Sequence, residues 1–293
     1  MHYTGQIYRP PMESETPLLQ ITSGCSHNRC AFCTMYEGTP FTVSRMEDIE
    51  ADLEEMRLAY GNGLRRIFLL NGDSFALPTK KLLKIAELIR ARFPHIETIS
   101  CYASIRNIGQ KSDEDLKELR SAGYNDLYIG LESGWAPALR QMRKGFTREE
   151  ADAQLDRLKK AGMRYGALLM FGLGGRGNGE ISARETANML NRNMPFVISA
   201  VPTAIAEGSD LERMREKGEY ATPTEKELIE EELLLLQLLE TTQECYFSGR
   251  HPYNTVPVGG YLSEKDRMTA RLARALTDLP EEFLDSSQQR GHL

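Results

Sequence analysis

The chain has 293 residues and a hydrophobic content of 41%, enough to bury a large core in one barrel-sized domain or two smaller ones. Its 36 basic residues are outnumbered by 42 acidic residues, and the net charge of −6 argues against a nucleic-acid binder. No run of about 18 apolar residues predicts a membrane span, and the N-terminus lacks the pattern of a signal peptide. We therefore expect a soluble, cytoplasmic protein.

Strand-like apolar runs alternate with amphipathic helical patterns along most of the chain. This alternation is typical of βαβ units with a parallel sheet, so the fold class is α/β. Serine or threonine followed three residues later by an acidic residue marks helix starts at Ser112, Thr147, Thr224 and Ser263. The predicted strands cover residues 18–22, 66–70, 98–103, 126–130, 164–171 and 196–200.

Six consecutive βα units predict a partial (βα)6 TIM-like barrel, with an open doubly wound sheet as the alternative. We expect an N-terminal extension over residues 1–17, the barrel over 18–243, and a short, helical C-terminal extension over 244–293 that closes the barrel. In both architectures ligands bind at the carboxyl ends of the strands. The loops that follow the strands should therefore carry the site.

Three cysteines lie within nine residues directly after the first predicted strand, as Cys25, Cys30 and Cys33 in a C-x4-C-x2-C pattern. Three cysteines spaced like metal ligands, and an odd total of five, do not fit a set of disulfides. We therefore expect a protein that is not in an oxidising compartment. Three close thiolates can hold a soft metal or an iron–sulfur cluster and leave one coordination position open. The alternative is a non-catalytic module, in which His27 or Cys245 completes a closed zinc site.

Polar residues and glycines follow the other predicted strands. The second strand is followed by Asn71, Gly72, Asp73 and Ser74, which suit either an ordinary βα turn or close approach to a ligand. Tyr102 and Ser104 share one face of the third strand, because side chains alternate along a strand.

Later strand ends carry charge and glycine. Glu132 follows the fourth strand directly, where its carboxylate could accept hydrogen bonds from an ammonium group, and Arg140 and Arg143 downstream could bind a carboxylate. The glycine-rich run at residues 172–177 follows the fifth strand. It suits close approach to a flat ligand and, as a weaker hypothesis, phosphate binding.

Taken together, these motifs resemble those of the radical S-adenosylmethionine (SAM) superfamily. The cysteine loop is similar to its C-x3-C-x2-C motif, including the aromatic Phe32 before the last cysteine. The run 71–73 is similar to its Gly-Gly-Glu motif. The segments 130–134 and 139–143 resemble the branch that holds anaerobic coproporphyrinogen III oxidase, methylthiotransferases and elongator-type radical enzymes. The departures are the fourth residue in the first cysteine gap, Leu168 and Leu169 where the branch often has an acidic residue, and Gly174 in place of a proline.

The resemblance implies an oxidoreductase-type enzyme with two cofactors, a 4Fe–4S cluster and SAM. The three cysteines would hold the cluster, which cleaves SAM to a 5′-deoxyadenosyl radical that abstracts hydrogen from a small-molecule substrate. An electron donor of the flavodoxin or ferredoxin type is implied as partner. The implied SAM contacts are Phe32, Gly72, Asp73, Tyr102, Ser104, Glu132 and Arg143.

Overall fold

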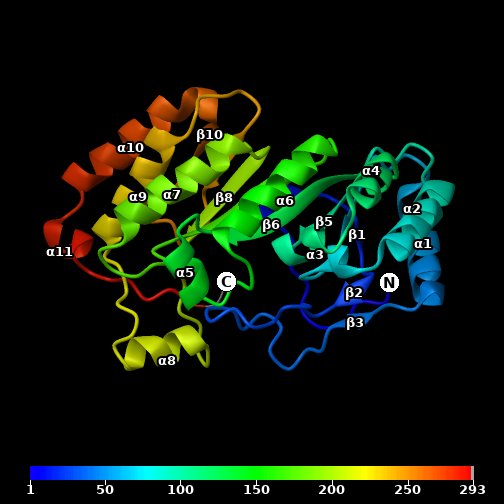
Figure 1. Cartoon of the computed structure of the whole chain (residues 1–293), viewed down its shortest axis with the longest axis horizontal. Helices are drawn as coiled ribbons and strands as arrows, with labels where there is room; N and C mark the ends of the chain where they lie inside the picture. Colours follow the sequence, from blue (N-terminus) through cyan, green and yellow to red (C-terminus); the bar gives the residue numbers. More distant parts are fainter. Residues whose placement is uncertain (292–293) are drawn as a thin grey trace. The chain divides into compact units, whose positions relative to one another are not determined.

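The computed structural model describes residues 1–291, which group into two compact units. The first unit comprises residues 1–28, 36–129 and 153–165, and the second comprises 29–35, 130–152 and 166–293 as far as these are described. Each unit is of the α/β class, with strands flanked by helices (Figure 1). The α/β class predicted from the sequence is therefore confirmed.

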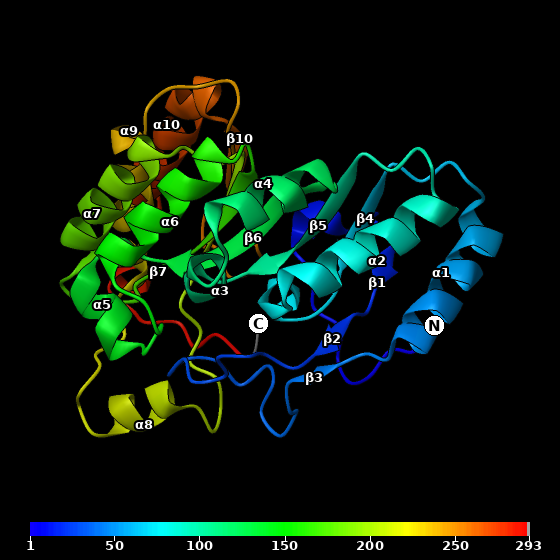
Figure 2. The ribbon, with the colours of Figure 1, turned by 45° about the vertical axis from the view of Figure 1, so that its right-hand side comes forward.

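In the first unit, β1 (Leu18–Leu19), β4 (Arg66–Leu69), β5 (Thr98–Ala103) and β6 (Tyr124–Glu132) pair in that order, and all pairs are parallel. The last three residues of β6 belong to the second unit. A separate antiparallel pair joins β2 (Thr22–Ser23) to β3 (Thr42–Val43). Figure 2 shows α1 (Met46–Tyr60) beside α2 (Thr79–Arg92).

The other helical segments of the first unit are short. They are η1 (Pro11–Glu13), η2 (Ser74–Ala76), α3 (Ile105–Gly109), α4 (Asp113–Ser121) and most of α6 (Arg148–Lys160). The unit is packed around fully buried aromatic side chains, with the rings of Phe68 and Tyr102 in edge-to-face contact at a centroid distance of 5.4 Å. Such pairs stabilise a core beyond the area that they bury.

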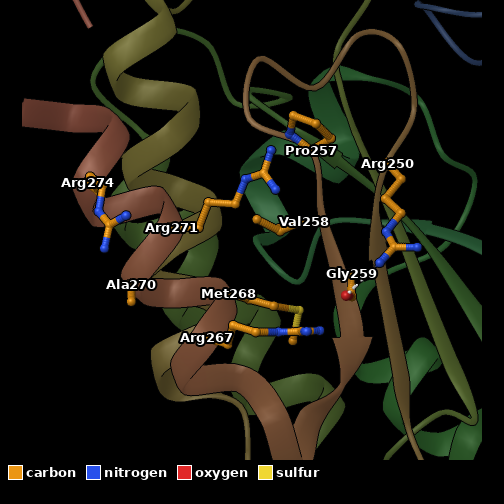
Figure 3. Close-up of a pocket in the computed structure, with 9 residues that line it drawn as sticks. All are labelled: Arg250, Pro257, Val258, Gly259, Arg267, Met268, Ala270, Arg271 and Arg274. Atoms are coloured by element: carbon orange, nitrogen blue, oxygen red, sulfur yellow. Dashed lines mark hydrogen bonds between the residues drawn. The ribbon is translucent and has the colours of Figure 1, made fainter. Parts of the chain in front are cut away.

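In the second unit, β7 (Arg164–Phe171) pairs with β8 (Val197–Pro202), β8 with β9 (Tyr246–Gly249), and β9 with β10 (Val258–Tyr261). The first two pairs are parallel and the last is antiparallel. The helix that carries Arg267 and Arg271 lies beside the strand that carries Val258 and Gly259 (Figure 3). The helical segments are α5 (Ala136–Gln141), α7 (Gly179–Arg192), α8 (Asp210–Glu216), α9 (Glu225–Leu238), η3 (Leu262–Glu264), α10 (Lys265–Asp278) and α11 (Glu281–Leu284).

All six predicted strands exist, but two details of the prediction are wrong. The run 18–22 is broken into β1 and β2, which pair with different strands. The C-terminal segment also contributes two strands, β9 and β10, in addition to helices. Each has four residues and includes glycine, so neither shows a clear alternation of apolar and polar residues. The proposed division at residues 17 and 243 stays a prediction.

Three of the four predicted helix starts are confirmed. Ser112 and Thr224 each form a reciprocal capping box, and Thr147 exchanges hydrogen bonds with Glu150. The start at Ser263 is wrong, because residues 262–264 form a 3-10 turn and α10 follows it without a side-chain cap. The helix that Thr224 caps ends at Leu238.

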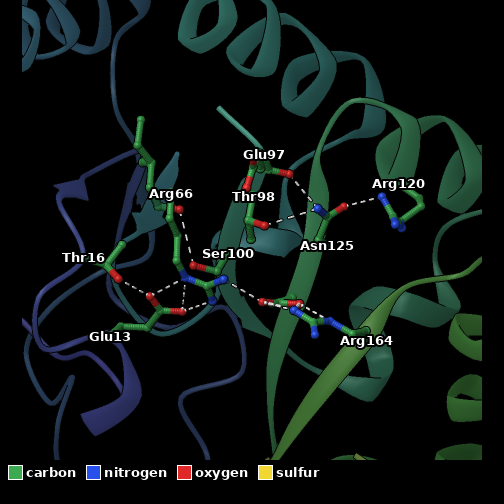
Figure 4. Close-up of polar contacts among 11 residues, drawn as sticks. Glu13, Thr16, Arg66, Glu97, Thr98, Ser100, Arg120, Asn125 and Arg164 are labelled. Atoms are coloured by element: carbon green, nitrogen blue, oxygen red, sulfur yellow. Dashed lines mark hydrogen bonds and ion pairs between the residues drawn. The ribbon is translucent and has the colours of Figure 1, made fainter. Parts of the chain in front are cut away.

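A buried network of charges ties the strands of the first unit together (Figure 4). Arg66 pairs with the fully buried Glu13 and, through Nη1, with Asp126 Oδ2 at 2.7 Å. Arg164 Nη2 lies 2.8 Å from Asp126 Oδ1. Burial alone would raise the pKa of Glu13, but the hydrogen bonds and charge of Arg66 hold that pKa below its ordinary value. Glu13 is therefore buried as a charged partner of Arg66.

Candidate functional site

The cysteine loop belongs to both units. Cys25 is part of the first, whereas Cys30 and Cys33 are part of the second. None of the three forms a disulfide, and all three have intermediate exposure. In residues 1–291 no group of three or more His, Cys, Asp or Glu side chains is gathered as a ready-made metal site. The donor set itself, three cysteines within nine residues and none of them in a disulfide, is the one that a 4Fe–4S cluster requires.

The backbone of the cysteine loop is anchored within the second unit. The Ala31 N–H donates to the Met142 carbonyl at 3.0 Å, and the Leu211 N–H donates to the Ala31 carbonyl at 2.8 Å. Ala31 is buried in an apolar cluster with Met142, Leu173 and Leu211, and Phe32 packs against that cluster. The segment between Cys30 and Cys33 is therefore held in place by buried contacts.

In the first unit, the turn after β4 lies against Cys25. A Cβ atom built on Gly72 would be 3.1 Å from Cys25 Cβ and 2.6 Å from Tyr36 Cε2, so only glycine fits here without displacing a neighbour. Ser26, the residue after Cys25, donates its hydroxyl hydrogen bond to Asp73 Oδ2. The structure thus brings the predicted residues Gly72 and Asp73 to the first cysteine.

Asp73 is a buried carboxylate, 1% exposed, at the centre of this arrangement. Burial raises its pKa to about 6, while hydrogen bonds from Ser26 and Asn107 act in the opposite direction. Lys111 is a second buried charge in the first unit, and its ammonium donates to the Leu77 carbonyl at 3.0 Å. Burial lowers the pKa of Lys111. A carboxylate in this setting is suited to receive a cation.

Asn107 was missed by the sequence analysis, although it connects two of the predicted residues. Its backbone N–H donates to Ser104 Oγ at 3.2 Å, and its side-chain amide donates to Asp73 Oδ1. Ser104 is the N-cap of α3, and the serine at the end of β5 was the available signal for this cap. Tyr102 is half-buried and packs edge-on against Phe68 and Tyr128.

In the second unit, Glu132 pairs with Lys144. The Lys144 ammonium donates to Glu132 Oε1 at 3.0 Å and lies 5.5 Å from the centre of the Phe32 ring. Burial alone would lower the pKa of Lys144, but Glu132 and the thiols of Cys30 and Cys33 outweigh burial and raise it. Lys144 was not singled out from the sequence, where it reads as one charge among several in a basic run.

Arg143, the predicted carboxylate-binding arginine, has an acidic partner within the chain. Its guanidinium forms an ion pair with Asp210, and its side chain is half exposed. Both Glu132 and Arg143 have positive φ angles, 63° and 53°, so the backbone turns sharply at each. The structure therefore brings Glu132, Phe32 and Lys144 together and directs Arg143 toward α8.

The glycine-rich run does not offer its amides to a phosphate. The Gly172 N–H donates to Glu231 Oε2 at 2.7 Å, and the Gly177 N–H donates to Glu227 Oε1 at 2.7 Å. Both carboxylates come from α9 of the same chain. The phosphate-loop hypothesis is wrong for these two amides, because acidic groups already occupy them.

The two cysteines outside the motif are buried. Cys101 and Cys245 are both 0% exposed, and burial raises the pKa of Cys245 to about 12. Cys101 is a small buried residue of β5. Neither thiol is placed as an accessible ligand.

The sequence model that describes the radical SAM superfamily matches residues 19–190, which is more than half of the 293 residues. The chain belongs to this superfamily of enzymes, whose members use a 4Fe–4S cluster and SAM. It is 24% identical over 199 residues to the tRNA-2-methylthio-N(6)-dimethylallyladenosine synthase of Syntrophus aciditrophicus (strain SB). The aligned region covers 64% of this chain and 41% of the synthase. The chain thus spans about two fifths of the length of this relative.

Solved structures show the same fold at low sequence identity. Elp3 of the archaeon Methanocaldococcus infernus superposes with a TM-score of 0.54 at 14% identity, covering 94% of this chain and 65% of its own. Methylornithine synthase (PylB) gives 0.52 at 14% identity, covering 89% of this chain and 80% of its own. In addition, no helix of the described residues is long and apolar enough to cross a bilayer.

Proposed function

We propose that this radical SAM enzyme cleaves SAM reductively and uses the resulting radical to abstract hydrogen from a small-molecule substrate. The carrying observation is the contact of the Gly72–Asp73 turn with Cys25 and Ser26. This contact supports the proposal that the turn binds the ammonium group of SAM, because the turn lies next to the first of the three cysteines. The cluster, when bound, supplies one electron that breaks a carbon–sulfur bond of SAM, giving methionine and the 5′-deoxyadenosyl radical.

The residues of the first unit have a binding role in this proposal. Cys25 holds one iron through its thiolate. The buried carboxylate of Asp73 accepts hydrogen bonds from the SAM ammonium, and Ser26 and Asn107 keep that carboxylate oriented. Gly72 keeps the turn close enough to Cys25, since any side chain there would push Tyr36 or Cys25 away. Tyr102 and Ser104 line the end of β5.

In the second unit, Cys30 and Cys33 would each hold one further iron, which leaves the fourth iron without a cysteine ligand. Phe32 lies between Cys30 and Cys33 in the sequence, and the Lys144 ammonium lies over its ring. Lys144 also orients the carboxylate of Glu132. Arg143 keeps its proposed role toward the SAM carboxylate, for which it must exchange its contact with Asp210. Lys144 is a second cation suited to the same carboxylate. An external donor of the flavodoxin or ferredoxin type supplies the electron.

Two observations on the cysteines favour an enzyme with one cluster held by this chain. A second 4Fe–4S cluster needs roughly four more cysteines, and the two remaining ones in this chain, Cys101 and Cys245, are both buried. The alternative of a zinc module requires a fourth ligand beside the three cysteines. Cys245 is 0% exposed in the core of the second unit, which makes it a poor candidate for that ligand.

Anaerobic reconstitution with iron and sulfide, followed by dithionite and SAM, tests the proposal. We expect a brown protein with four irons per chain in its cluster that releases 5′-deoxyadenosine. The variants Cys25→Ala, Cys30→Ala and Cys33→Ala should each lose iron and product, whereas Cys245→Ala serves as the matched control and keeps both. A colourless protein that holds one zinc and yields no 5′-deoxyadenosine would refute the proposal. Deuterium transfer from candidate compounds into 5′-deoxyadenosine then identifies the substrate.

A further inference from the structure

An arginine-rich pocket lies in the second unit, and none of its lining residues is assigned to SAM or the cluster. It has a volume of about 670 Å³ and is formed by α10, β10 and the segment before β10 (Figure 3). Pockets of this size are typical of small-molecule sites. Its lining consists of Arg250, Pro257, Val258, Gly259, Arg267, Met268, Ala270, Arg271 and Arg274.

Three of the four lining arginines come from one face of α10. Arg267, Arg271 and Arg274 are spaced by four and three residues, so their side chains project from the same side of the helix. Met268 and Leu272 on the same helix are buried instead. The amphipathic pattern of α10 therefore places its cations at the pocket.

The fourth arginine, Arg250, comes from the opposite wall and is held in position. Its Nη2 donates to the Gly259 carbonyl at 3.0 Å, so the guanidinium lies across β10. A Cβ atom on Gly259 would be 2.6 Å from Arg250 Nε. A glycine on β10 is thus needed for the arginine to adopt this position.

The positive charge of the pocket is largely uncompensated. Arg267 has only a long contact of 3.5 Å with Glu264, and within residues 1–291 the guanidinium groups of Arg271 and Arg274 make no hydrogen bond or ion pair. None of the nine lining residues is acidic. Like charges gathered in one cavity repel one another unless an anion neutralises them.

We propose that this pocket binds a small molecule that carries two or more phosphate groups. Guanidinium groups present several N–H donors in a fork that matches phosphate oxygens. Four arginines line this one pocket. The proposal goes beyond the function proposed above and does not depend on it. Binding of the phosphate compound at this pocket does not require that SAM be cleaved.

A small molecule fits the surroundings better than an RNA backbone. Exposed acidic residues flank the arginines in the sequence. They are Asp266 and Asp278 on α10, and Glu281 and Glu282 on α11. An extended phosphate backbone would meet these carboxylates, whereas a compact ligand would contact the lining of the pocket. The net charge of −6 points the same way.

Calorimetric titration of the full chain with inorganic pyrophosphate tests this proposal, with inorganic phosphate as the weaker probe. We expect pyrophosphate to bind and to raise the melting temperature. The double variant Arg271→Ala/Arg274→Ala should weaken binding at least tenfold, while its melting temperature without ligand stays that of the wild type. The control Arg184→Ala removes an exposed arginine of α7 that is paired with Glu180, and should bind as the wild type does.

Two results would overturn the proposal. One is pyrophosphate affinity that is the same in the double variant and the wild type. The other is a single-stranded RNA that binds through Arg271 and Arg274 while pyrophosphate does not bind, because the site would then belong to a nucleic acid. Loss of 5′-deoxyadenosine formation has no bearing on either result, so the two proposals fail independently.

Discussion

Lys144 and Glu132 form an ion pair, with Lys144 Nζ 3.0 Å from Glu132 Oε1 and side chains that are only 10% and 12% exposed. The pair lies against Phe32, in the same unit as Cys30 and Cys33. It therefore places one cation and one carboxylate next to the second half of the cysteine motif. That arrangement could not be read from the order of charges in the sequence.

Removing the cation alone should leave Glu132 as a poorly solvated charge. We expect Lys144→Met to lower the free energy of unfolding by roughly 3 kcal/mol, measured by chemical denaturation. The double variant Lys144→Met/Glu132→Gln should recover most of this loss, because no charge is then left without a partner. Equal losses in the single and double variants would contradict this account of the pair.

The turn beside Cys25 should tolerate no side chain at residue 72. In Gly72→Ala the new Cβ would meet Tyr36 Cε2 at 2.6 Å and Cys25 Cβ at 3.1 Å. We expect a destabilisation of about 1–3 kcal/mol from this overpacking and a lower iron content after reconstitution. Gly63→Ala is the matched control, because a Cβ there has no atom within 4 Å. Iron content that stays unchanged in Gly72→Ala would argue against the close approach.

Asp126 should be required as a charge, because it is 1% exposed and pairs with both Arg66 and Arg164. Asp126→Asn removes a negative charge that compensates the partly buried guanidinium of Arg66. We expect the free energy of unfolding to fall by roughly 3 kcal/mol. Glu97→Gln is the control, since its pair with Arg65 is exposed and should contribute less than about 1 kcal/mol. Similar effects of the two substitutions would show that burial does not matter here.

Glu231 should make the protein less stable as the pH rises. Burial raises its pKa from 4.5 to about 7. Below pH 4.5 both the folded and the unfolded chain carry the proton, so the full stability is present. Between pH 4.5 and about 7 the unfolded chain ionises first, so unfolding becomes easier, by up to roughly 3 kcal/mol.

Thermal denaturation between pH 4 and pH 8 checks this prediction. The fall in stability over this range should be smaller in Glu231→Gln, whose amide oxygen can still accept from the Gly172 N–H. The exposed Glu230 is on the same helix, so Glu230→Gln should follow the wild-type curve. Parallel curves for the wild type and Glu231→Gln would rule out a titrating role for Glu231.

Local signals predicted much of the fold. The capping residues Ser112, Thr147 and Thr224 act within three residues of themselves, so their pattern is complete in the sequence. The strands at residues 98–103 and 164–171 have the predicted bounds, because their apolar runs are long enough to be distinctive. β9 and β10 were missed, since a strand of four residues that includes glycine depends on its neighbours for definition.

The sequence alone determined the chemistry of the motif. The spacing of Cys25, Cys30 and Cys33, with the glycine and carboxylate of residues 72 and 73, already indicated the radical SAM family that the comparison shows. Only the tertiary structure decided the partners of the charges. It paired Glu132 with Lys144 and Arg143 with Asp210, and it occupied two amides of the glycine-rich run with carboxylates of α9. Such pairings depend on which distant segments pack together, and no local pattern in the chain encodes that.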